Sequence, residues 1–278
     1  MKRIFDELSY ESSKITTKRY STSFSLGIRF LNSNIHEPIY AIYGFVRFAD
    51  EIVDSFHGYD KEKLLKDFKK QTFEAIETGI SLNPILNSFQ HTVNKYQIPH
   101  ELIHTFLNSM EMDLNKQVYD RSKYEEYILG SAEVVGLMCL KIFVNGDEKM
   151  YLKLKFEAMK LGSAFQKINF LRDLKDDFKE LGRSYFPNVD MTFFNDQVKK
   201  DIEKDIAKDF KLGLDGIKKL PKNARFGVYV AYIYYHNLFL KIQAKPAATI
   251  LKERVRIPNN KKISLLFFSF IKHNLNWI

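Results

Sequence analysis

Two acidic stretches, DEIVD at 50–54 and NFLRDLKDD at 169–177, decide how this chain is interpreted. In each stretch, oxygen-bearing side chains recur every four residues, so they share one face if the segment is helical. Like charges at this spacing destabilise an isolated helix by roughly 0.2–0.5 kcal/mol per pair. A positive group is therefore expected between the two stretches. The side chains are those of Asp50, Glu51, Asp54, Asn169, Asp173, Asp176 and Asp177.

Two interpretations of these stretches are open. Acidic residues on a helix often form a solvated face, but the first stretch lies within YAIYGFVRFADEIVDSF at 40–56, which is mostly apolar. Charges in such a segment need partners, because burying them alone is costly. Arg47 lies on the same face as Asp50 and can pair with a carboxylate or grip a phosphate. Mg²⁺ prefers carboxylates together with substrate phosphates, which favours an enzyme acting on a diphosphate ester.

Composition narrows the class of protein. The chain has 278 residues, enough for a large core, and its 24 Phe and 15 Tyr suit either that core or a pocket for a long apolar ligand. Cys139 is the single cysteine, so an intrachain disulfide is excluded and a structural zinc site is not expected. The first residues, MKRIFDELSYESSK, lack the apolar run of a secretory signal, so we expect a cytoplasmic protein.

The net charge of +9 is concentrated near the C-terminus. Residues 218–278 contain 12 Lys and Arg and one acidic residue, Glu253. The same region contains ISLLFFSF at 263–270, far shorter than the roughly 20 residues that span a bilayer. It can lie on the inner face of an anionic membrane as a peripheral contact or pack on the protein as an amphipathic helix. Nucleic-acid binding is not expected, since no recognised module is visible.

Periodicity is helical almost throughout, with few glycines and prolines. This pattern predicts a single all-α domain over residues 1–278, with a basic, aromatic C-terminal segment at 254–278. The predicted helices cover 3–20, 36–55, 61–79, 82–96, 100–117, 123–145, 148–178, 190–212, 222–245 and 261–275.

The second acidic stretch carries a family resemblance. QKINFLRDLKDD at 166–177, followed by LGRSYFP at 181–187, resembles the signature Q-x-x-N-x-x-R-D-x-x-E-D and G-R-x-Y-x-P of the head-to-head prenyl synthases, which include squalene, dehydrosqualene and phytoene synthases. Asp176 stands where Glu is usual, which keeps an oxygen ligand. The signature is specific, and the resemblance is closest to bacterial phytoene synthases.

Other segments extend the resemblance over residues 14–265. Tyr43, Arg47, Asp50, Glu51 and Asp54 match the signature R-x-x-D-D-x-x-D, with Glu51 in place of the second Asp. RYSTSFSLGI at 19–28 resembles the S-x-S-F element, and RVRIPNNKKI at 254–263 resembles a basic segment of phytoene synthases. YILGSAEVVG at 127–136 resembles a further stretch of the family but carries Glu133 where a small residue is usual, so we expect an altered pocket shape.

The resemblance implies a helical isoprenoid-synthase bundle with a central cavity in which two prenyl diphosphates bind with Mg²⁺ or Mn²⁺. It implies metal ligation by the seven oxygen-bearing residues of the two acidic stretches. It also implies catalytic roles for Asp50, Asp54, Asp173 and Asp177, with Tyr43 and Tyr127 orienting the leaving group or accepting a proton. Substrate-binding roles are implied for Ser21, Ser23, Phe24, Arg47, Gln166, Arg172, Arg183 and Tyr185.

Core packing remains the alternative for the aromatic residues, and helix capping for Ser21 and Ser23. The reaction implied first is phytoene formation from two geranylgeranyl diphosphates through a cyclopropylcarbinyl diphosphate, without NADPH. The alternative is squalene or dehydrosqualene formation from two farnesyl diphosphates, and NADPH is required only for squalene. A catalytically inactive relative that serves as a binding subunit is a third interpretation.

Overall fold

The structure is a computed structural model that describes residues 2–115, 119–179, 185–187 and 194–257, with the backbone alone for 176–179. Every regular element in these ranges is helical, which confirms the all-α prediction. None of the described helices is long and apolar enough to cross a bilayer. The elements are α1 Lys2–Tyr20, α2 Thr22–Arg29, η1 Ser33–Ile35, α3 His36–Ser55, α4 Lys61–Thr78, α5 Pro84–Tyr96, α6 His100–Met112, α7 Arg121–Ile128, η2 Leu129–Glu133, α8 Val134–Phe143, α9 Glu148–Lys179, α10 Asp196–Lys219, α11 Lys222–Gln243 and α12 Ala247–Ile250.

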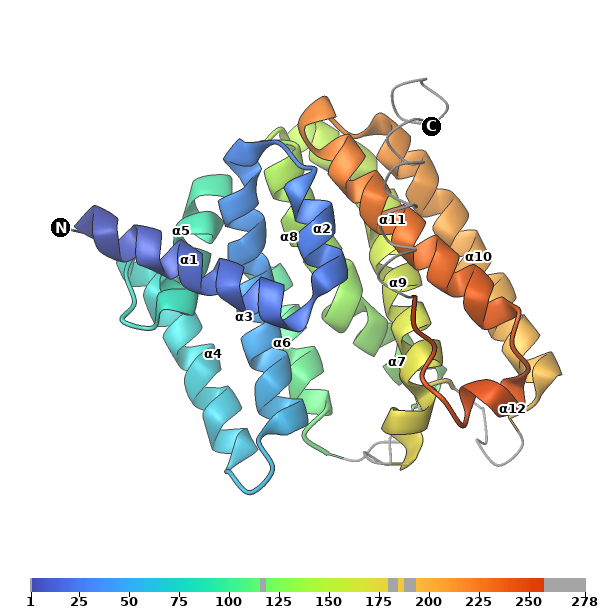
Figure 1. The fold of residues 1–278 in the computed structure, drawn as a ribbon. Helices are drawn as coiled ribbons and strands as arrows, with labels where there is room; N and C mark the ends of the chain where they lie inside the picture. The colour runs from blue at the N-terminus through green and yellow to red at the C-terminus, as the bar shows by residue number, and fades with distance from the viewer. Residues whose placement is uncertain (1, 116–118, 180–184, 188–193, 258–278) are drawn as a thin grey trace.

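Buried side chains form two clusters that meet at α8. One cluster lies mainly among α2–α6, where the fully buried Phe45 ring stacks on Phe89 with 3.8 Å between ring centroids. The other lies among α7 and α9–α12. Helix α8 is apolar except for Lys141, and it places Met138 in the first cluster and Leu137 in the second. In Figure 1, α8 accordingly lies between the blue N-terminal helices and the orange C-terminal pair.

The two acidic stretches lie on α3 and α9. Helix α3 covers the predicted range 36–55, and α9 exceeds the predicted 148–178 by one residue. The C-terminal ends of both helices lie at the same end of the molecule, at the bottom of Figure 1. Because the acidic residues lie near those C-terminal ends, the topology brings the two stretches to one end of the bundle.

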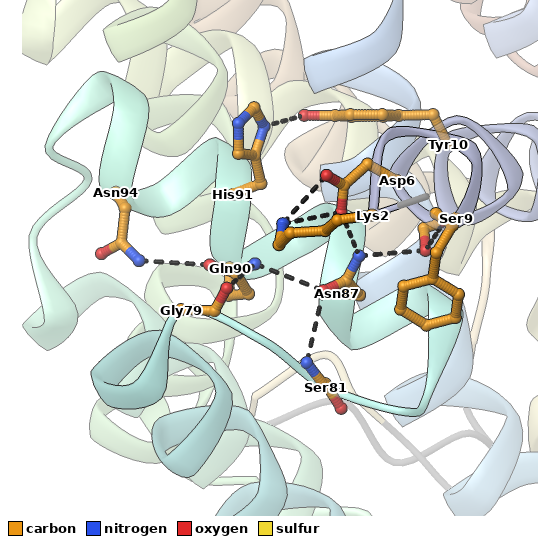
Figure 2. Close-up of polar contacts among 11 residues, drawn as sticks. Lys2, Asp6, Ser9, Tyr10, Gly79, Ser81, Asn87, Gln90, His91 and Asn94 are labelled. Carbon is orange, nitrogen blue, oxygen red and sulfur yellow. Dashed lines mark hydrogen bonds and ion pairs between the residues drawn. The ribbon is translucent and has the colours of Figure 1, made fainter.

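Helix α1 is attached to the bundle through polar contacts. Its buried residues are Ser9, Ser13 and Thr17 rather than an apolar stripe. Figure 2 shows Asn87 of α5 at the centre of this seam, donating to Asp6 at 3.0 Å and to Ser9 at 3.1 Å. Small hydroxyl side chains let the helices approach closely, and their hydrogen bonds satisfy groups that burial would otherwise leave unpaired.

Several predicted boundaries are wrong for local reasons. Helix α10 was predicted over 190–212 but covers 196–219: Asn195 caps its start by accepting from the amides of Gln197 and Val198. Gly213 and Gly216 do not end it, since they are the points where α10 packs closely on α9. Helices α2 and α12 were not predicted. The predicted helix at 261–275 lies outside the described residues.

The predicted helix at 123–145 is interrupted by the π-turn η2. Helices α6 and α9 both pack closely against this turn. A Cβ at Gly130 would lie 2.5 Å from the Ser109 Cβ, and one at Gly162 would lie 2.7 Å from the Ala132 carbonyl oxygen. π-Turns are often found at functional sites, and residues of η2 line the cavity described next.

Candidate active site

A cavity of about 690 Å³ lies between the two acidic helices and is completed by α2, α8, α10 and α11. It is polar at the end where α3 and α9 terminate and mainly apolar elsewhere. The volume falls within the range of small-molecule sites, roughly 300–1,000 Å³. The predicted site residues that line it are Ser21, Phe24, Tyr43, Arg47, Asp50, Asp54, Tyr127, Gln166, Asn169, Arg172, Asp173 and Tyr185.

On the α3 wall, Arg47 organises the carboxylates. Its two terminal nitrogens donate to Asp50 and Glu51, and its guanidinium lies 4.3 Å from the centroid of the Tyr20 ring. The Nε atom of Arg47 is buried and has no hydrogen-bond partner among the described residues. This arginine therefore neutralises carboxylates and still has a donor for an anionic ligand.

On the α9 wall, two guanidinium groups meet one carboxylate. Arg172 donates from Nε to Asp173 at 2.8 Å, and Arg254 Nε lies 2.7 Å from the same Asp173 oxygen. Burial acts to lower the pKa of Arg172, but the Asp173 carboxylate outweighs it and raises that pKa. Asn169, one turn away, accepts from the Tyr235 hydroxyl at 3.4 Å. Asp173, Arg172 and Arg254 are thus paired with one another, as burial requires.

The α3 wall has an excess of negative charge. Burial, followed by the charge of Asp54, raises the pKa of Asp50 to about 7. The buried Asp113 adds to the same effect. A carboxylate with a raised pKa is disfavoured in its charged form, and a nearby cation reverses that preference.

A buried cluster at the cavity wall links three segments distant in sequence. The Tyr127 hydroxyl donates to Asp113 at 2.6 Å, and the Tyr185 hydroxyl donates to the other oxygen of Asp113 at 3.3 Å. Burial, followed by the charge of Asp113, raises the pKa of Tyr127 well above its ordinary value. Tyr127 is therefore a hydrogen-bond donor in this cluster, which restricts the proton-accepting role that the resemblance implied.

An aromatic layer lies beyond the polar end. Phe24 contacts the rings of Tyr43 and Tyr235, at 5.8 and 6.0 Å between centroids, and Phe165 stacks on Tyr235 at 4.1 Å. Burial raises the pKa of Tyr43 to about 12, so its phenol stays protonated at neutral pH. These rings act both as core and as cavity wall, because they pack on one another and present apolar faces to the cavity.

The remaining predicted residues lie elsewhere or outside the described part of the chain. Ser21 lines the cavity and also caps α2 by accepting from the Phe24 amide at 3.1 Å. Ser23 and Glu51 are not among the cavity-lining residues. Glu133 does not line the cavity, and its buried side chain lies 3.5 Å from Lys160, so the altered pocket shape stays a prediction. Outside the description lie Arg183 and the side chains of Asp176 and Asp177.

Sequence reasoning missed several polar residues of the cavity, among them Asp113, Glu157, Tyr235 and Arg254. Arg254 lies in the basic segment RVRIP, whose resemblance to phytoene synthases could have indicated a site residue. Asp113 ends α6, and Tyr235 lies in a run of aromatic residues on α11, so neither stood out from its surroundings.

The donor set fits a hard divalent cation. Within the described ranges, no three His, Cys, Asp or Glu side chains converge into a preformed metal cage. Mg²⁺ does not require one, since it is usually held by one or two carboxylates, waters and substrate phosphates. The repulsion between Asp50 and Asp54 and the unpartnered Arg47 Nε favour a cation bound together with an anionic ligand.

The family follows from a comparison with known proteins. The family model for squalene/phytoene synthase matches residues 17–261. The chain therefore belongs to the squalene/phytoene synthase family, whose members are prenyltransferases.

Curated relatives include proteins with different products in their names. Phytoene synthase of Arthrospira platensis is 25% identical, over 93% of this chain and 91% of its own length. The 4,4'-diapophytoene synthase of Staphylococcus haemolyticus is 26% identical, over 73% of this chain and 70% of its own. Presqualene diphosphate synthase of Zymomonas mobilis is 29% identical, over 73% of this chain and 68% of its own length.

Solved structures support the fold. A dehydrosqualene synthase crystallised with a ligand superimposes with a TM-score of 0.84, covering 98% of both chains at 21% sequence identity. At that identity the likeness concerns the fold, and it confirms the predicted isoprenoid-synthase architecture.

The Asp113 cluster generates a prediction about stability. Hydrogen bonds to a buried charged group contribute about 1.5–3 kcal/mol. We expect Asp113→Asn and Tyr127→Phe, combined in a double-mutant cycle, to show a coupling free energy of unfolding of that size, measured by urea denaturation. The matched control is Asp113→Asn with Tyr229→Phe, a buried tyrosine on α11, where the two effects should add. Additive effects in the Tyr127 cycle would contradict the assigned hydrogen bond.

Proposed function

We propose that this protein is a single isoprenoid-synthase domain, residues 1–278, that condenses two prenyl diphosphates head to head. Two geranylgeranyl diphosphates giving phytoene are the preferred reaction. The observation that carries the proposal is one cavity with carboxylates and arginines from α3 and α9 at one end and apolar walls along the rest. Such a cavity matches a substrate with a charged head and a hydrocarbon tail.

The polar end is suited to binding diphosphate. Arg47 and Arg172, with Arg254 beside them, offer guanidinium groups that match phosphate oxygens in geometry and charge. Magnesium, when bound, neutralises negative charge that develops on the leaving diphosphate. The residues proposed to hold it are Asp50, Asp54, Asn169 and Asp173, which line the cavity, together with Glu51, Asp176 and Asp177.

The apolar walls are suited to the steps that follow. Loss of diphosphate leaves an allylic cation, which the double bond of the second substrate attacks. The resulting cation loses a proton as the three-membered ring closes, giving a cyclopropylcarbinyl diphosphate. A second ionisation and rearrangement joins the chains, and loss of a proton ends the reaction. Water would capture these cations, so the layer of Phe24, Tyr43 and Tyr235 has the task of excluding it. Tyr43 and Tyr127 remain candidates for orienting the leaving group.

The preference for the longer substrate is supported by the relative named phytoene synthase, which aligns with 93% of this chain. The segment RVRIP, present here at 254–258, adds to that support because of its resemblance to phytoene synthases. Squalene or dehydrosqualene formation from farnesyl diphosphate is the second candidate.

Product extraction tests the proposal. Purified protein incubated with Mg²⁺ and geranylgeranyl diphosphate is expected to yield phytoene whether or not NADPH is present. Farnesyl diphosphate is the matched comparison: a dominant product from it would move the assignment to squalene with NADPH, or to dehydrosqualene without it. No product from either substrate would contradict the condensation and favour a binding subunit.

The acidic residues generate a second prediction. We expect Asp50→Ala and Asp173→Ala to lower kcat by at least about a hundredfold, because each removes charge complementarity to the transition state. Far-UV circular dichroism should stay unchanged, since both side chains face the cavity. Glu74→Ala, an exposed carboxylate on α4 paired with Lys70, is the control and should retain full activity. Substantial turnover in either aspartate variant would count against the assigned roles.

We also propose a peripheral membrane contact through the C-terminal region. Residues 218–278 combine 12 basic residues with the apolar run ISLLFFSF at 263–270. Such a combination binds anionic lipid surfaces, and a C40 hydrocarbon product has no stable place in water.

Flotation with liposomes tests this contact. The protein is expected to float with vesicles containing phosphatidylserine at low salt and to dissociate as salt rises, because the attraction is screened. Vesicles of phosphatidylcholine alone and a chain ending at Pro258 are the matched controls. Failure to float with anionic vesicles at low salt would rule the contact out.

A further inference from the structure

A charged pair, Glu157 and Lys219, lies at the end of the cavity opposite the carboxylates. We propose that Glu157 of α9, held by Lys219 of α10, closes this far end and limits the length of prenyl chain that the enzyme accepts. The inference rests on the proposed function, in which the cavity holds prenyl tails, and it names the residue that sets their length.

Helix α9 lines the cavity from Leu154, one turn before Glu157, to Asp173. Cavity-lining residues recur along it at steps of four: Glu157, Leu161, Phe165, Asn169 and Asp173. The series is polar at its C-terminal end, apolar in the middle and charged again at Glu157. Sixteen residues of helix separate Glu157 from Asp173, which corresponds to about 24 Å along the axis. The apolar path for a tail therefore lies between two charged positions.

Other helices end around Glu157. Leu31, after α2, and Phe143 and Leu220, at the ends of α8 and α10, also line the cavity. The Asn223 side chain donates to the Phe143 carbonyl at 3.4 Å, and the Asn32 amide donates to the Asn223 carbonyl at 2.8 Å. In Figure 1 the α2–α3 and α10–α11 connections lie together at the top, opposite the C-terminal ends of α3 and α9.

Glu157 lies between the cavity and the surface. Its side chain is 15% exposed, whereas that of Lys219 is 48% exposed, and Lys219 Nζ lies 2.7 Å from Glu157 Oε1. Gly216 makes this placement possible: a Cβ there would lie 2.5 Å from the Glu157 Cβ. The close approach of α10 and the bond to Lys219 hold the glutamate side chain at this part of the cavity wall.

A hydrocarbon tail that reaches this point has no favourable way forward. Advancing would either displace the ion pair or press apolar carbon against a carboxylate that is held in place, and both are costly. In apolar pockets, one methylene group alone changes kcat/KM by about 10–200-fold. Removing the glutamate side chain should therefore admit a longer prenyl chain.

The test compares diphosphates of increasing length. The quantity measured is kcat/KM for a diphosphate one isoprene unit longer than the preferred substrate, divided by kcat/KM for the preferred substrate. We expect Glu157→Ala to raise this ratio at least about tenfold. Lys219→Ala, which releases the clamp from the exposed side, should shift the ratio in the same direction. Asp201→Ala, which removes an exposed ion pair with Lys204 elsewhere on α10, is the control and should leave it unchanged.

Binding of saturated alkyl diphosphates of graded length, measured by calorimetry, gives a readout independent of turnover. The longest chain bound tightly should increase in Glu157→Ala and Lys219→Ala. The inference would be overturned if, in both variants, the length cutoff for binding and the kcat/KM ratio stayed within twofold of their values in the unsubstituted protein. If the unsubstituted protein forms no product but its length cutoff moves in these variants, the proposed condensation fails while the far-end assignment stands.

Discussion

The arrangement of this molecule depends on holding several carboxylates close together at the edge of an apolar space. Such charges repel one another and lose hydration, and burial with Asp54 nearby raises the pKa of Asp50 to about 7. The structure offsets this cost with arginines on each wall. Arg47 serves Asp50 and Glu51 on α3, while Arg172 and Arg254 serve Asp173 on α9. A site that is poised in this way is well matched to a ligand carrying both a cation and phosphate.

That charge distribution requires rigid supports behind each acidic helix. Behind α3, Phe45 is fully buried and stacks on Phe89 of α5. Behind α9, Lys167 donates to Asp209 of α10 at 2.6 Å, and Ser163 donates to the same carboxylate at 2.7 Å. The first support is apolar and the second is ionic. Both fix the rotation of a helix about its axis, so the cavity-facing residues keep their direction when the charges at the polar end change.

The sequence predicted the helices that carry the acidic residues because their signals are local. Helical periodicity between helix-breaking residues predicted the bounds of α3, and the specific signature placed the second acidic stretch on α9. Tertiary contacts decided the rest. Gly213 and Gly216 continue α10 because α9 packs against them. Asp113 belongs to the site because Tyr127 and Tyr185 converge on it. The sequence around Asp113 does not indicate these contacts, because they are made between segments far apart in the chain.

The two ends of the cavity act on different properties of a substrate. At the polar end, recognition depends on charge, and every prenyl diphosphate offers the same charge whatever its length. Members of one family can therefore share that end and still differ in product. In the proposed assignment, length is determined at the far end, where Glu157, paired with Lys219 of α10, lies about 24 Å from Asp173 along α9. The signatures that reveal the chemistry thus carry no information about chain length, which depends on side chains outside them.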